Sequence, residues 1–277
     1  MDFINAAHYD SAGSTTAVVN KPTNTADNDI MFALIRRNII AEPTTVPTGW
    51  TLIGNREDAT YNQEYWLYWK LAASEGANYT WEWADAARIC ATIVTYRDGF
   101  NTADPIDVVS NTPYVDNNTT VRSATMTVSA ANSPLVNFAN GYGGSEITFT
   151  KPSMPTTDWV ENIDFGSVDS RCWREICSMV WTGSGATGDI DATASLSLDA
   201  KHGFAVGLNP AAGGQPSGGG PADDRFRFRQ SCLIMTASNA IAARRGNCGG
   251  YPTWHPSTGI LNPALDAQDD NNSRMIN

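Results

Sequence analysis

Side chains that could perform chemistry are sparse in this sequence. Three histidines, His8, His202 and His255, lie far apart, with no i,i+4 pair to hold a metal and no adjacent nucleophile. His202 begins an apolar run, which favours a core or strand-edge position. The glycine-rich residues 183–189 lack the lysine of a phosphate-binding loop and predict a turn. We therefore expect no catalytic residue, no metal and no cofactor.

Carboxylates are the one catalytic residue type in good supply. Glycoside hydrolysis needs two carboxyl groups roughly 5–10 Å apart, and candidates are Glu161, Asp164, Asp169, Asp189 and Asp191. Chance pairs are expected among 29 acidic residues. Exposed aromatic rings could stack on sugars, but tryptophans in a large β-sandwich are more often core residues. A glycosidase or polysaccharide-binding enzyme remains a minor alternative, and we expect a protein that is not an enzyme.

The cysteines indicate neither a zinc site nor a disulfide framework. There are five, an odd number without a CxxC pair, at positions 90, 172, 177, 232 and 248. Reduced, buried thiols are the favoured interpretation, and a single disulfide is the alternative.

The most distinctive local pattern alternates arginine and phenylalanine. As a strand, residues 225–229 would place three guanidinium groups on one face and two aromatic rings on the other. Either the strand completes this protein's own sheet, or its arginines bind carboxylates of a neighbouring subunit. The candidate partner-binding residues are Arg225, Phe226, Arg227, Phe228, Arg229, Arg244 and Arg245.

Elements that could position these side chains are short β-strands. Segments rich in β-branched and aromatic residues recur up to about residue 206, separated by Asn, Asp, Gly, Pro and Ser. In residues 79–83, Tyr79, Trp81 and Trp83 share one face of a strand, whereas residues 65–71 read as buried on both faces. Helical signals are few, with one possible turn at residues 84–88. The pattern predicts an all-β, jelly-roll-like antiparallel β-sandwich with an irregular C-terminal extension.

Composition and charge divide the chain into parts. Residues 1–206 form the predicted sandwich, residues 207–221 a Gly/Pro-rich linker, and residues 222–277 a C-terminal arm. The chain carries 18 basic and 29 acidic residues, a net charge of −11, which works against nucleic-acid binding. It has no apolar run of the ~20 residues that a membrane helix requires. We expect neither nucleic acid nor membrane as a partner.

A chain of short patterns resembles a domain of tailed-bacteriophage structural proteins. It runs through residues 47–54, residues 69–72 with Glu75, and residues 79–81, and continues through residues 93–97, 105–107 and 181–189. The resemblance covers about residues 1–205 and carries no catalytic signature. It implies a β-sandwich displayed on a virion.

This resemblance leads to two functional expectations. The first is a capsid decoration or cement protein that stabilises the shell, with the arm clamping neighbouring coat subunits. The alternative is a tail-tip or tail-fibre protein that recognises host glycans through exposed aromatic residues. Expected partners are other virion proteins, either the major capsid protein or tail proteins, with a homo-oligomer and a glycan as further expectations. We expect the core residues Trp50, Trp69, Trp81 and Ile93 to lie between two sheets.

Overall fold

The N-terminal half of the sandwich is a five-stranded antiparallel sheet. The computed structural model describes residues 1–111, 119–152 and 158–211, and no helix occurs in these ranges. The first sheet has the order β1-β5-β2-β4-β3. Its strands are β1 (Asp2–Asn20), β2 (Ile30–Arg37), β3 (Thr51–Asp58), β4 (Gln63–Leu71) and β5 (Asn78–Arg97).

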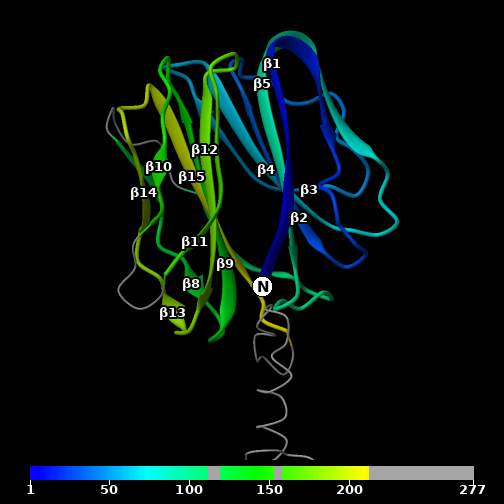
Figure 1. Cartoon of the computed structure of the whole chain (residues 1–277), viewed down its shortest axis with the longest axis vertical. Helices are drawn as coiled ribbons and strands as arrows, with labels where there is room; N and C mark the ends of the chain where they lie inside the picture. The colour runs from blue at the N-terminus through cyan, green and yellow to red at the C-terminus, as the bar shows by residue number, and fades with distance from the viewer. Residues whose placement is uncertain (112–118, 153–157, 212–277) are drawn as a thin grey trace, which may run out of the picture. The chain divides into compact units, whose positions relative to one another are not determined.

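Residues of the second half form a second five-stranded antiparallel sheet, of order β11-β12-β9-β15-β6. Its strands are β6 (Ile106–Asn111), β9 (Ser133–Tyr142), β11 (Val160–Ser167), β12 (Cys172–Trp181) and β15 (Ala200–Leu208). Two small sheets, β10-β14-β7 and β13-β8, accompany it. They contain β7 (Thr120–Ser123), β8 (Thr127–Val128), β10 (Phe149–Thr150), β13 (Gly185–Ala186) and β14 (Ile190–Ala194). The predicted antiparallel β-sandwich is confirmed (Figure 1).

The two halves repeat one topology. When the five main strands of each half are numbered in chain order, both sheets have the order 1-5-2-4-3. The outer strands correspond as well. In the first repeat the end of β1 pairs with the start of β5, and in the second repeat β7 pairs with β14 in the same way. The bridge between Thr45 and Glu82 in the first repeat corresponds to the pairing of β10 with β14 in the second. The chain therefore contains an internal structural duplication.

Local irregularities recur at equivalent places in the two repeats. The β3–β4 pair has a bulge between Leu52 and Gly54, and the β11–β12 pair has one between Glu161 and Ile163. A residue with positive φ precedes β4 and β12 alike, Asn62 in one repeat and Arg171 in the other. Asn28 and Asn132 likewise have positive φ just before β2 and β9. Shared bulges and turns fix the same register in both sheets, which supports the duplication.

Apolar residues form layers on both faces of each large sheet. One cluster lies between the large sheets and joins residues such as Phe32 and Val94 to Phe138 and Phe204. Another lies on the opposite face of the first sheet, under the part of the β1–β5 ribbon that carries Trp81. Two further clusters lie between the second large sheet and the small sheets. Figure 1 shows the two halves side by side, blue to cyan and green to yellow.

The four residues that were expected between two sheets are all buried or partly buried, but only one of them lies between the large sheets. Trp50, Trp81 and Ile93 are at most 7% exposed and belong to the outer cluster beneath the ribbon. Trp69 is partly buried and faces the second sheet. The predicted burial is therefore confirmed for Trp50, Trp81 and Ile93, but their expected location between the large sheets was wrong, because the outer layers are part of the fold.

Two local expectations are corrected. Residues 84–88 lie inside β5 and not in a helical turn. The sandwich does not end at residue 206, because β15 continues to Leu208 and the Ala211 amide donates to the Gly99 carbonyl at 3.3 Å. The predicted linker at residues 207–221 therefore begins inside the sandwich. The predicted arm at residues 222–277 lies outside the described residues.

Candidate functional site

The seven predicted partner-binding residues all lie outside the described residues, and so does His255. His202 lies on β15 and is 2% exposed, which confirms the core interpretation of this residue. His8 lies on the edge strand β1, where its ring stacks on Phe165 with centroids 4.1 Å apart. The candidate site must therefore be built from other residues.

Part of the space between the large sheets is polar. Eight side chains fill it, and each is at most 2% exposed: Arg36, Gln63, Tyr65, Cys90, Asn140, Cys172, Arg174 and His202. They share strand faces with apolar residues of the inter-sheet cluster. Arg36 follows Phe32 and Leu34 at intervals of two, and Arg174 precedes Ile176. We call this group the inter-sheet polar layer.

The duplication places the members of this layer at equivalent positions. Arg36 is flanked in register by Tyr65 and Cys90. In the other sheet, Asn140 is flanked by Arg174 and His202. Gln63 and Cys172 are the first residues of β4 and β12 and complete the set. The positions are thus conserved between the repeats while the chemistry differs.

Each arginine of the layer reaches into the opposite sheet. Arg174 donates to the carbonyl oxygens of Leu34 at 2.9 Å and Cys90 at 3.2 Å. Arg36 donates to the Ser170 carbonyl at 2.6 Å and to the Gln63 side chain, and its guanidinium lies 4.5 Å from the ring centre of Tyr142. These contacts tie the two repeats together across a buried interface.

The layer holds positive charge with little carboxylate compensation. The ion pairs found in the described residues involve Lys70, Arg97 and Arg122, and neither arginine of the layer. The Cys172 sulfur accepts a hydrogen bond from Arg174 at 3.0 Å. Burial opposes ionisation of this thiol, but a hydrogen bond from Cys90 and the charges of the two arginines lower its pKa below that of an ordinary cysteine. These contacts favour the thiolate form of Cys172.

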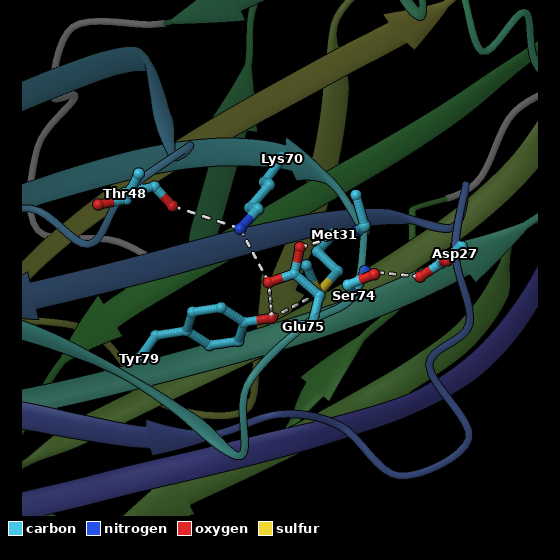
Figure 2. A network of polar contacts seen from close by, with 8 residues as sticks. Asp27, Met31, Thr48, Lys70, Ser74, Glu75 and Tyr79 are labelled. Atoms are coloured by element: carbon cyan, nitrogen blue, oxygen red, sulfur yellow. Dashed lines mark hydrogen bonds and ion pairs between the residues drawn. The ribbon is translucent and has the colours of Figure 1, made fainter.

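A second polar cluster lies in the outer layer of the first repeat, at the β4–β5 turn. Glu75 accepts hydrogen bonds from Lys70 and from the Tyr79 hydroxyl, both at 2.8 Å, and from the Ala73 amide at 2.9 Å (Figure 2). Lys70 also donates to the Thr48 carbonyl at 3.3 Å. Burial raises the pKa of Glu75, but these hydrogen bonds outweigh it and the pKa is lowered. The network fixes the turn against the segment that leads into β3.

Replacement of Glu75 by glutamine should therefore weaken the fold. We expect Glu75→Gln to lower the free energy of unfolding at pH 7 by about 1–2 kcal/mol, because the Lys70 ammonium loses its anionic partner in a site where Glu75 is only 4% exposed. Urea unfolding would measure it. Tyr79→Phe and the double variant would complete a cycle, and additive losses would contradict the network.

The structure places the five carboxylates that could have formed a hydrolase pair in three different surroundings. Glu161 and Asp164 lie on β11 beside Glu175 of β12, on the outer face of the sheet. Asp189 and Asp191 instead pair with Arg122, at 3.0 and 2.6 Å. Asp169 lies exposed in the β11–β12 turn. Burial, followed by the neighbouring carboxylates, raises the pKa of Glu175 to about 7, although the adjacent Cys177 thiol acts in the opposite direction.

Glu175 should make stability depend on pH. Its pKa is higher in the folded chain than in the unfolded chain, so the folded state binds more protons between about pH 4.5 and 7. Glu175 should therefore contribute a fall in the free energy of unfolding as pH rises through this window, by on the order of 1 kcal/mol. Glu175→Gln should remove that contribution and leave the stability at pH 4.5 unchanged. Glu146→Gln, at an exposed position, is the control, and an equal effect of both variants would refute the assignment.

In the described residues, no group of three or more His, Cys, Asp and Glu side chains is arranged to hold a metal ion, and no helix could span a membrane. Comparisons with family models, curated proteins and solved structures find no match for the chain. The inter-sheet polar layer was not predicted from the sequence. Its signal was an arginine two residues away from an apolar residue on the same strand face, Arg36 after Leu34 and Arg174 before Ile176.

Proposed function

We propose that the chain is a non-enzymatic structural protein of a tailed-phage virion, and in the first place a capsid decoration or cement protein. It would assemble in the bacterial cytoplasm as a homo-oligomer and bind the major capsid protein through its C-terminal arm. The alternative is a tail-tip or tail-fibre protein bound to other tail proteins.

The main observation in favour is where the residues that carry the phage resemblance lie. Trp50, Lys70, Glu75, Tyr79 and Trp81 form one packed unit in the outer layer of the first repeat. Trp50 contacts Tyr79 and Trp81 with ring centroids 5.2 and 5.4 Å apart, and Tyr79 bonds the Glu75–Lys70 pair (Figure 2). The resemblance therefore concerns residues that hold a fold together, as expected of a structural module.

Burial of the tryptophans bears on the glycan alternative. Six of the eight tryptophans in the described ranges are buried, and Trp69 and Trp181 are partly buried, so few indole rings are available for a sugar to stack on. Glycan recognition would therefore rely mainly on other surface residues. This observation favours the shell role over the glycan-binding role.

The last described residues of the chain lie at the same end of the sandwich as Met1. Ala211 bonds Gly99, and a β-carbon added to Gly99 would lie 2.7 Å from the Met1 nitrogen. Phe100 and Pro210 form a bridge at the same place. The segment proposed to bind the shell is therefore attached to the sandwich at this end.

Truncation after Ala211 tests the proposal. The shortened chain should keep the Tm of the sandwich within a few degrees, because the last described contacts are retained. Its binding to virions that lack the protein should fall at least tenfold relative to the full chain, measured by sedimentation. Undiminished binding would contradict the role of the arm.

The arginines provide a milder variant for the same assay. Changing Arg225, Arg227 and Arg229 to Ser should weaken binding at low salt and matter less at 1 M, where the screening length falls from about 10 Å to about 3 Å. Each exposed pair contributes about 0.2–1 kcal/mol, summed over many copies. Binding that is independent of salt and equal for both chains would assign this pattern to the protein's own sheet.

A further inference from the structure

Two cysteines of the inter-sheet polar layer face each other from opposite repeats. Cys90 is on β5 and shares its face with Val94 and Tyr96, whereas Cys172 is on β12 and shares its face with Ile176. These three apolar residues line the space between the sheets, so both thiols point into it. Both cysteines are free and fully buried.

A single nitrogen of Arg174 holds the pair together. This nitrogen donates to the Cys90 carbonyl at 3.2 Å and to the Cys172 sulfur at 3.0 Å. The Cys90 thiol also donates a hydrogen bond to the Cys172 sulfur. We propose that Cys90 and Cys172 are a reactive dithiol that hydrogen peroxide converts into a disulfide, which covalently joins the two repeats across the sandwich.

The reaction balances as two steps. The Cys172 thiolate attacks one oxygen of the peroxide, which breaks the O–O bond, forms a sulfenic acid and releases hydroxide, which takes up a proton to become water. The Cys90 sulfur then attacks the Cys172 sulfur and displaces the sulfenic oxygen, which leaves as water with the thiol proton. Two electrons leave the dithiol, and one peroxide becomes two waters. Buried disulfides between packed sheets also occur in immunoglobulin domains.

Electrostatics assign the two roles within the pair. Burial and the hydrogen bond to Cys172 raise the pKa of Cys90, so that it retains its proton. The lowered pKa of Cys172 makes it the attacking group. Cys177 is a built-in control, because it is also free, but its pKa is raised by burial and by Glu175, and its side chain belongs to the outer cluster.

Peptide mapping of the folded protein tests the proposal. The parent is the full chain with Cys232→Ser and Cys248→Ser, treated with hydrogen peroxide at pH 7.5 and then denatured with an alkylating reagent. We expect most chains to carry a Cys90–Cys172 linkage, with Cys177 alkylated. Cys177→Ser should give the same yield. Cys90→Ser should give no linkage and a sulfenic acid at Cys172 that dimedone traps, with near-UV circular dichroism confirming the fold.

The pH profile supplies a second readout. The oxidation rate should level off at a lower pH than that of an ordinary thiol, which accelerates until about pH 8.5, because the pKa of Cys172 is lowered. If Cys90 and Cys172 of the treated chain are both alkylated after denaturation, or link only after unfolding, the proposal is wrong. The test does not involve the virion, so its result is independent of the proposed function.

Discussion

Replacement of Trp81 by alanine is expected to lower the free energy of unfolding by about 3–5 kcal/mol, the largest effect of any single change considered for this protein. Trp81 is fully buried, and its ring contacts those of Trp50, Tyr68 and Tyr79. It lies in the ribbon segment that covers the outer face of the first sheet. Removing the indole would leave a cavity that the surrounding strands, fixed on both sides, could fill only in part.

Denaturant unfolding of Trp81→Ala would give this number, with Val18→Ala as the matched control. Val18 is on the same ribbon but 41% exposed, and it is the register partner of Thr80, next to Trp81. The control should cost about 0.5 kcal/mol or less. A loss below about 1 kcal/mol for Trp81→Ala would mean that the ribbon does not pack on the sheet in solution.

Gly203→Val is expected to lower the free energy of unfolding by about 3 kcal/mol, the second largest effect. This change tests the outer layer of the second repeat. A β-carbon at Gly203 would lie 2.3 Å from the carbonyl oxygen and 2.6 Å from the carbonyl carbon of Arg122 on β7. Because the obstacle is backbone, it cannot rotate away. The strand β7 would have to move off β15, which would disrupt the layer.

Gly76→Val is the control for this second change. Gly76 is exposed in the β4–β5 turn, with no heavy atom within 4 Å of an added β-carbon. Its stability should change by about 0.5 kcal/mol or less. Equal stability of the two variants would show that β7 is not seated on β15.

Sequence patterns predicted the class of fold because strand signals are local. Tyr79, Trp81 and Trp83 alternate as expected and are at most 5% exposed, and residues 65–68 are buried on both faces. Residues 2–14 and 160–167 were missed as strands because they form the polar, partly exposed edges of the sheets. The irregular pattern of an edge strand carries little periodicity.

The duplication could not be found in this way. Equivalent positions hold residues as different as Arg36 and Asn140, or Tyr65 and Arg174, so the repeats share backbone geometry and little sequence. The polar layer was missed for a related reason, since nothing local shows that β5 and β12 face each other. Contacts between Arg174, Cys90 and Leu34 join residues far apart in the chain.

The most direct test of the proposed function is the copy number of this protein in purified particles of the phage that is proposed to carry it. Quantitative mass spectrometry against the major capsid protein would provide it. A cement or decoration protein predicts a copy number comparable to that of the coat protein. A few copies per particle would indicate the tail alternative, and absence from particles would contradict the virion role.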